Sequence, residues 1–318
     1  MFFPFADHPN PRGYIPWVTW GLIAANVLVY LLISLPLSMT RVDPTDPALI
    51  EWLRAVSRVG VDPRLLAARA TAYDLFTFAH GYKPGAPAFD DLLFSLFLHA
   101  GFLHLAGNML FLWIYGDNVE HRLGRLPFLL AYLGSGVAAT LAFSTMAGHS
   151  MTPLVGASGA ISGVLGMYYV WFPRNQVKVF VAFFPFLFDV VMVPARFVLA
   201  IFVILDNLLP LLMGAGGGVA YGAHLGGFAA GLALAAVLAR RGVPAELRRA
   251  PRVHDREAAS GGMLDGRQAR AASELATGRM WLERGYPVNA WQHLANAARL
   301  DPDGPIGAEA RALMAEVS

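Results

Sequence analysis

Long apolar runs with few or no charged residues occupy most of the first 240 positions of the chain, and short polar segments separate them. The first run, residues 17–37, holds no charged side chain and is long enough to cross the roughly 30 Å hydrocarbon core of a bilayer as a helix. The pattern predicts an all-α, polytopic membrane protein with six spans, at residues 17–37, 92–115, 126–147, 154–172, 193–212 and 219–239.

The composition agrees with a membrane protein, because 56% of the 318 residues are hydrophobic and only 14% are charged. The absence of cysteine excludes disulfides, thiolate metal sites and a cysteine nucleophile. A net charge of +2 is too small to indicate a nucleic-acid partner, so we expect none. We interpret the first run as a span and not as a cleavable signal, because it is too long and no basic region precedes it.

Basic residues indicate how the chain is oriented, because Lys and Arg in short loops resist translocation. They follow spans two, four and six, whereas the short loops after spans three and five contain none. We therefore expect both termini in the cytoplasm, with a bacterial inner (cell) membrane as the location. Residues 41–91 then form a long external segment, partly associated with the membrane. Residues 179–188 are apolar but too short to cross, and we expect them along the inner face.

The composition becomes charged and alanine-rich after residue 239, which predicts three parts: a membrane domain at residues 1–240, a linker at 241–266 and a helical hairpin at 267–318. A single repeat cannot bury its apolar face well, so the hairpin should pack on a third helix near residues 306–317 or bind a cytoplasmic protein partner. An ordinary appendage of two or three helices is the alternative. The register of one tetratricopeptide repeat is matched by Gly278, Trp281, Ala290, Leu294, Ala297 and Pro302.

Three polar side chains share one depth in the predicted bundle. His104, Ser158 and His224 each lie 16 residues before a charged residue that we place at the inner boundary of spans two, four and six, namely Glu120, Arg174 and Arg240. At about 1.5 Å per residue, all three lie about 24 Å above the inner boundary, within reach of a water-filled cavity from outside. Asn108 lies one turn below His104 on the same helical face. Polar groups at this depth are costly and therefore usually functional.

This cluster can carry out serine protease chemistry without a metal or a cofactor. His224 would take the proton from Ser158, whose oxygen attacks a peptide carbonyl, and would later give that proton to the leaving amine. The backbone N–H of Ser158, the Asn108 amide and the His104 ring are candidate donors to the oxyanion. Spans four and six can approach closely because both are rich in glycine, namely Gly159, Gly163, Gly166, Gly222, Gly226, Gly227 and Gly231.

These residues resemble those of the rhomboid family of intramembrane serine proteases. The resemblance covers about residues 15–240 and runs through HAGFLHLAGN (99–108), EHRLG (120–124), GASG (156–159) and GAHLGG (222–227). It implies a six-helix rhomboid-like bundle, a dyad of Ser158 and His224, and oxyanion donors at His104 and Asn108. The implied substrates are single-pass membrane proteins, cut within or near an unstable transmembrane helix after a small residue.

The chain departs from the family pattern at two places. Asp90 and Asp91 replace the Trp-Arg pair that many members carry nine residues before the first histidine of the motif, so the anchoring of that loop should differ. Ser162 replaces the tyrosine that in some members stacks on the catalytic histidine. This second departure weakens the positioning of His224 but leaves the dyad intact.

Three further residues are candidates for the cavity or its gate. His99 either lines the water cavity or caps the outer end of span two. Phe202 in span five is a candidate gate residue facing span two, and lipid-facing packing is its alternative. Asp206, also in span five, either orients His224 as a third member of a triad or bonds a neighbouring helix or water near the external cavity.

Two other classes of function remain as alternatives. A non-catalytic rhomboid-like protein would bind transmembrane clients without cutting them, although the intact serine and histidine argue against this. A small-molecule channel would need a continuous polar path, and the inner halves of spans two, four and six look sealed. Zinc and aspartyl intramembrane protease chemistries lack their His-Glu-x-x-His and Gly-x-Gly-Asp motifs.

Overall fold

The computed structural model describes residues 2–11, 13–56, 62–183, 187–214, 220–241, 266–283 and 287–316. Contacts divide the chain into two compact units, Met1–Ala250 and Pro251–Ser318. The described residues are mostly helical, which confirms the predicted fold class. Apart from its two ends, the predicted linker at 241–266 lies outside the described residues.

Four helical stretches among the described residues are long and apolar enough to cross a bilayer. They are Trp17–Ser38 (α1, Trp17–Val29; η1, Tyr30–Ser34; α2, Leu35–Ser38), α8 (Arg125–Ala147), Ala195–Leu212 (α10, Ala195–Val203; η4, Ile204–Leu208; α11, Leu209–Leu212) and Tyr221–Ala239 of α12 (Tyr221–Arg241). A fifth is counted if Asp91–Phe97 (α6, Asp91–Phe94; η3, Ser95–Phe97) and α7 (Phe102–Leu123) form one span, although they are bent by 94°. The number six therefore stays a prediction.

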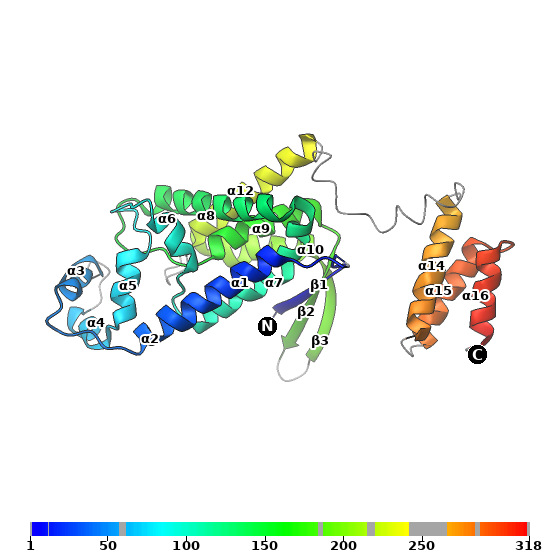
Figure 1. Ribbon diagram of the computed structural model, residues 1–318, viewed down its shortest axis with the longest axis horizontal. Helices are drawn as coiled ribbons and strands as arrows, with labels where there is room; N and C mark the ends of the chain where they lie inside the picture. The colour runs from blue at the N-terminus through cyan, green and yellow to red at the C-terminus, as the bar shows by residue number, and fades with distance from the viewer. Residues whose placement is uncertain are drawn as a thin grey trace. The chain divides into compact units, whose positions relative to one another are not determined.

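The predicted fourth span differs most from its expectation. Its helix, α9, runs only over Ser158–Trp171, and its 14 residues are too few to cross a bilayer by length. The helix contacts α7, α8, α10 and α12, and residues 159–168 are all buried (Figure 1). Because other helices surround α9, its apolar residues form the core of the bundle and do not face lipid.

Glycines bring α9 and α12 into backbone contact. A Cβ added at Gly227 would lie 2.1 Å from the carbonyl oxygen of Gly159, and one added at Gly231 would lie 1.9 Å from that of Gly163. No other residue fits at these separations, so the close approach predicted from the glycine pattern is confirmed for this helix pair.

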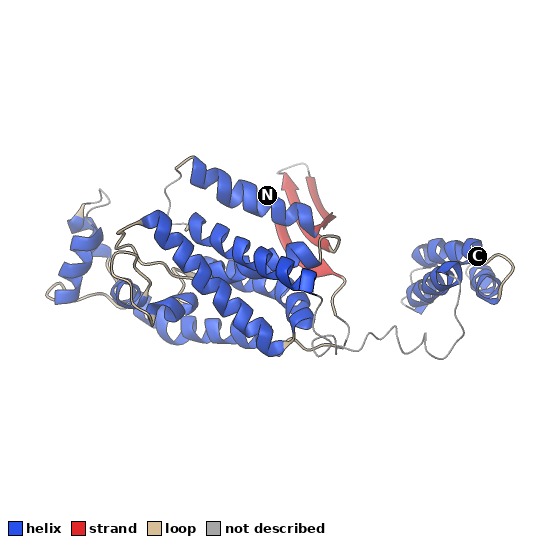
Figure 2. Cartoon of the chain, turned by 90° about the horizontal axis from the view of Figure 1, so that it is seen from above, coloured by secondary structure: helices blue, strands red, loops and turns tan. Residues whose placement is uncertain are grey.

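The structure adds a three-stranded antiparallel sheet that the sequence pattern did not predict. β1 (Phe2–His8) pairs with β2 (Gln176–Phe183), and β2 pairs with β3 (Leu187–Pro194); Figure 2 shows the sheet in red beside the helices. Alternate residues Val177, Val179 and Val181 are buried, which is the period of a strand with one covered face. The apolar segment at 179–188 therefore lies in β2 and β3, except for residues 184–186, which lie outside the description.

Two buried carboxylates attach the N-terminal segments to the bundle. Glu120 of α7 accepts hydrogen bonds from the backbone N–H groups of Val18 and Thr19, so it neutralises the N-terminal end of α1. Asp7 of β1 accepts hydrogen bonds from Asn118 of α7 and from the Tyr168 hydroxyl of α9. Burial, together with the nearby charge of Asp117, raises the pKa of Asp7 to about 7.

The segment between the first and second predicted spans folds into three helices, α3 (Pro47–Val56), α4 (Pro63–Arg69) and α5 (Ala72–His80). They share a small core that includes Leu49, Trp52 and Phe78. Figures 1 and 2 show these helices and the sheet at opposite ends of the unit. The placement of these two ends on opposite sides of a membrane stays a prediction.

The second unit contains three helices among its described residues, α14 (Gly266–Glu283), α15 (Pro287–Leu300) and α16 (Pro305–Glu316). Leu294 is fully buried in their common core, and Trp281 packs against that core. α16 corresponds to the third helix on which the hairpin was expected to pack. The tetratricopeptide-like character of this unit stays a prediction.

Candidate active site

Ser158 is the first residue of α9, and the loop before it has little conformational freedom. Gly156 adopts φ +123°, which favours glycine, and a Cβ at this position would lie 2.8 Å from the His104 ring. The N–H of Gly156 donates to the carbonyl of Ser95, and Leu154 exchanges two backbone hydrogen bonds with Tyr82, which follows α5. These bonds fix the loop in place, so the serine is presented at a defined point.

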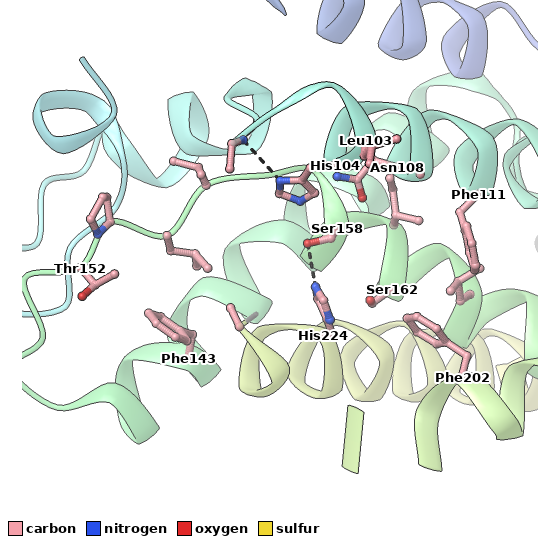
Figure 3. A pocket seen from close by; sticks show the side chains of 18 residues that line it. Leu103, His104, Asn108, Phe111, Phe143, Thr152, Ser158, Ser162, Phe202 and His224 are labelled. Carbon is pink, nitrogen blue, oxygen red and sulfur yellow. Dashed lines mark hydrogen bonds between the residues drawn. The ribbon is translucent and has the colours of Figure 1, made fainter. Parts of the chain in front are cut away.

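His224 lies in the first turn of α12 and faces the serine. Its Nε2 lies 2.8 Å from the Ser158 Oγ, a hydrogen bond drawn as a dashed line in Figure 3. The glycine contacts between α9 and α12 bring these helices close enough for the two side chains to meet. The arrangement has the geometry of a nucleophile beside a general base.

A cavity of about 610 Å³ opens onto this pair. Its polar lining includes His104, Asn108, Ser158 and His224, and most of the other lining residues are apolar, as Figure 3 shows for Leu103, Phe111 and Phe143. A mostly apolar cavity with a few convergent polar groups is typical of a binding or catalytic site.

Both predicted oxyanion donors lie in α7 and reach this cavity. The N–H of Ala100 donates to His104 Nδ1 at 3.4 Å, so Nε2 carries the ring proton and is a donor. The Asn108 Nδ2 is buried and has no hydrogen-bond partner in the described part of the chain. In Figure 3, Ser158 lies between these two side chains and the His224 ring. A developing oxyanion beside Ser158 would give the unpartnered amide an acceptor.

Comparison with known proteins identifies the unit that holds this site. Residues 88–241 match the family described as Rhomboid domain. The chain contains a rhomboid domain. With its several membrane-crossing helices, it is a multi-pass membrane protein.

Relatives agree with this assignment. The chain is 36% identical over 95 residues to the mitochondrial Rhomboid protein 1 of Saccharomyces cerevisiae. This match covers 29% of this chain and 28% of that protein. It is 38% identical over 91 residues to the Putative rhomboid protease YdcA of Bacillus subtilis, a match that covers 27% of this chain and 43% of that protein. It is 30% identical over 157 residues to the Rhomboid-type serine protease 2 of Emericella nidulans, a match that covers 48% of this chain and 27% of that protein. The matches therefore span from about a quarter to less than half of the length of these relatives.

The rhomboid domain holds a residue at the site that the sequence analysis missed. Asn207 is buried at 1% exposure, and its Oδ1 lies 2.7 Å from the Nδ1 of His224. Asp206 is exposed and does not line the cavity, so the structure contradicts the triad role, one of its two alternatives, and the other, a bond to a neighbouring helix or water, stays a prediction. Successive residues of a helix point in directions about 100° apart, so only one of the two neighbours can face His224. The polar pair inside an apolar run was the available signal.

His99 also needs correction, since it does not line the cavity. Its ring is fully buried, with its centroid 5.1 Å from that of His104. Its backbone N–H and carbonyl both bond to the hydroxyl of Tyr73 in α5. The bend before α7 turns this residue toward α5, so that it contacts the His104 ring and joins α5 to the rhomboid domain.

Phe202 lines the cavity and lies between two of the elements that form it. Its ring centroid is 5.7 Å from that of Phe111 in α7 and 6.4 Å from that of His224. Ser162, at the position where some family members carry a tyrosine, also lines the cavity. An aromatic ring therefore lies beside His224 in this rhomboid domain, and span five supplies it.

The departure from the family pattern at Asp90 and Asp91 has a structural replacement too. Asp91 lies 3.7 Å from the ammonium group of Lys83, and both side chains are buried. The same ammonium donates to the carbonyl oxygens of Phe78 and Gly81. The loop is thus anchored through a buried ion pair.

Among the residues that the structure describes, no three His, Asp or Glu side chains are grouped to hold a metal ion.

Proposed function

We propose that this rhomboid domain is an intramembrane serine endopeptidase that cleaves single-pass transmembrane proteins within or near their membrane segment. The observation that carries the proposal is the 2.8 Å contact between Ser158 Oγ and His224 Nε2 on the wall of the cavity. The names of two relatives support it, a putative rhomboid protease and a rhomboid-type serine protease. No ligand, metal or redox group is needed for this chemistry.

The reaction follows from the geometry of the pair. His224 Nε2 takes the hydroxyl proton while Ser158 Oγ attacks the scissile carbonyl, and the new oxyanion accepts hydrogen bonds from Asn108, His104 and the Ser158 N–H. Collapse of this intermediate expels the amine, which receives the proton from His224. Water then hydrolyses the acyl-enzyme by the same steps in reverse order, with His224 again acting as the base.

Lateral access through span five completes the proposal. The Phe202 and Phe111 rings meet between α10 and α7, and both line the cavity. A transmembrane substrate has to reach Ser158 from the lipid, and separation of these two rings would open that route. We also propose that both termini are cytoplasmic and that the C-terminal unit binds a cytoplasmic partner.

Purified full-length protein in detergent, incubated with a generic single-pass substrate, tests the function. Ser158→Ala and His224→Ala should each abolish cleavage, because removal of either partner disables the same acylation step. A fluorophosphonate probe should label the wild type at Ser158 and neither variant. Thermal unfolding curves verify that both variants remain folded. Cleavage by a well-folded Ser158→Ala protein would exclude this mechanism and leave client binding as the better function.

A further inference from the structure

The hydrogen bonds at the active site extend one residue beyond the serine and the histidine. Ser158 Oγ meets His224 Nε2, and His224 Nδ1 meets Asn207 Oδ1 at 2.7 Å. Asn207 Nδ2 in turn donates to the carbonyl oxygen of Phe202 at 2.8 Å. The chain of contacts thus runs from α9 through α12 into span five, where it ends on a backbone group.

This chain determines which nitrogen of His224 carries the proton. The Phe202 carbonyl can only accept, so the amide nitrogen of Asn207 must face it and the amide oxygen must face His224. An oxygen is an acceptor, and therefore His224 Nδ1 carries the proton that it binds. The lone pair of Nε2 is then directed at Ser158 Oγ, which is the tautomer that a general base needs.

The local backbone explains how Asn207 reaches the histidine. Residues Ile204–Leu208 form a π-helical turn, η4, in the middle of span five. Such turns are rare and are frequent at functional sites. Asn207 is buried within this turn, whereas its neighbours Asp206 and Leu208 are exposed. The turn therefore presents Asn207 to α12 and leaves its other four residues exposed.

The same stretch of span five also closes the cavity. Phe202 contacts Phe111 of α7 through its ring and binds Asn207 through its carbonyl. Span five is the least buried of the four candidate spans, with 17% of its residues buried against 22–33% for the others. Few buried contacts favour local movement. Displacement of this span from α7 would therefore move the group that holds His224.

We propose that Asn207 is a positioning residue that holds His224 in the base-competent tautomer only while span five is seated against the bundle. The inference rests on the proposed protease function and adds a consequence: access and activation are coupled. When span five moves out to admit a substrate, His224 loses its partner, and the base is restored when the span returns. His104 is the other titratable side chain that lines the cavity with His224, and it lies on α7, outside the moving element.

Variants of Asn207 test the positioning role in the full-length protein. Asn207→Ala should lower kcat and the rate of Ser158 labelling by a fluorophosphonate on the order of 10- to 100-fold, with little change in KM, because an unheld ring samples the wrong tautomer. Asn207→Asp should restore most of the rate, since a carboxylate also accepts from Nδ1. It should move the acidic limb of the pH–rate profile to higher pH, because its charge favours protonated His224. Asp206→Ala is the matched control and should behave as wild type.

A crosslink tests the coupling to span five, and the absence of native cysteine makes it specific. Phe111→Cys and Phe202→Cys together, joined by a short bifunctional reagent, should block cleavage of the transmembrane substrate. The small probe should still label Ser158 in the locked protein at the rate of the unlocked double variant or faster. Adding Asn207→Ala to the locked protein should lower that labelling.

The outcomes separate the two proposals. If the wild type shows neither Ser158-dependent cleavage nor labelling, the protease function fails. If the wild type is active and a folded Asn207→Ala protein has its kcat and labelling rate, only the positioning role is overturned. If Asn207→Ala does not fold, an Asn207→Asp protein with an unmoved pH profile overturns it instead. Slower labelling after the crosslink would refute the coupling.

Discussion

The α9–α12 pair and span five both contribute to the site, but they pack in opposite ways. α9 and α12 are in backbone contact through glycine, and they carry the proposed nucleophile and the proposed base. Span five is the least buried candidate span, exposes Ile201, Ile204 and Leu205, and carries Asn207, whose side chain contacts His224. The proposed reacting atoms thus lie on two closely packed helices, whereas the proposed entry element has few buried residues.

The largest effect is expected from separating α12 from α9. In Gly231→Ala, the added Cβ would lie 1.9 Å from the Gly163 carbonyl oxygen, so α12 must shift away from α9. We expect a loss of about 1–3 kcal/mol in stability and of most activity, since a displaced His224 no longer meets Ser158. Gly134→Ala in α8 is the control, because nothing lies within 4 Å of its added Cβ. Thermal melts and probe labelling measure both changes, and equal behaviour of the two variants would contradict the scaffold role.

The next effect concerns α7, which carries the two proposed oxyanion donors beside α9 and α12. Asn108→Ala should lower kcat by a factor on the order of 10 to 1,000 with modest change in KM, because the donor acts mainly in the transition state. His104→Ala should behave similarly. Steady-state kinetics on the transmembrane substrate measure the loss. If both variants keep full turnover and stability, the backbone N–H groups alone stabilise the oxyanion.

A smaller effect, of opposite sign, is expected in span five. Phe202→Ala removes the ring contact with Phe111 and should raise cleavage of transmembrane substrates several-fold by easing access. The same change removes the ring beside His224, so labelling by the small probe should not rise. Comparing the two assays in one preparation measures the difference. A parallel increase in both would mean that Phe202 restrains catalysis and not access.

The smallest effect is expected from the C-terminal unit, which has its own core. Deleting residues 253–318 should leave cleavage of a test substrate in detergent nearly unchanged, because the deleted residues belong to a separate compact unit that begins at Pro251. Partner capture or oligomeric state in cells should change. Loss of activity in a truncated protein that inserts correctly would show that this unit is part of the enzyme.

The sequence predicted those features correctly for which few residue types are suitable. The glycine pattern predicted the close approach of α9 and α12, and the shared depth of His104, Ser158 and His224 predicted that they would line one cavity. The sequence did not allow a choice where two neighbouring positions both carry a polar residue. Asp206 and Asn207 are both polar residues in one apolar run, and only the turn of η4 decides which of them is buried.

The sequence by itself determined the helical membrane architecture and the candidate pair of Ser158 and His224, because long apolar runs and buried polar groups each have few physical solutions. Tertiary structure alone decided three further features: the short α9, the sheet of β1, β2 and β3, and the Asn207 contact. Each depends on partners distant in the chain. α9 needs neighbouring helices to cover it, β1 pairs across more than 160 residues, and Asn207 reaches His224 only when span five lies against α12.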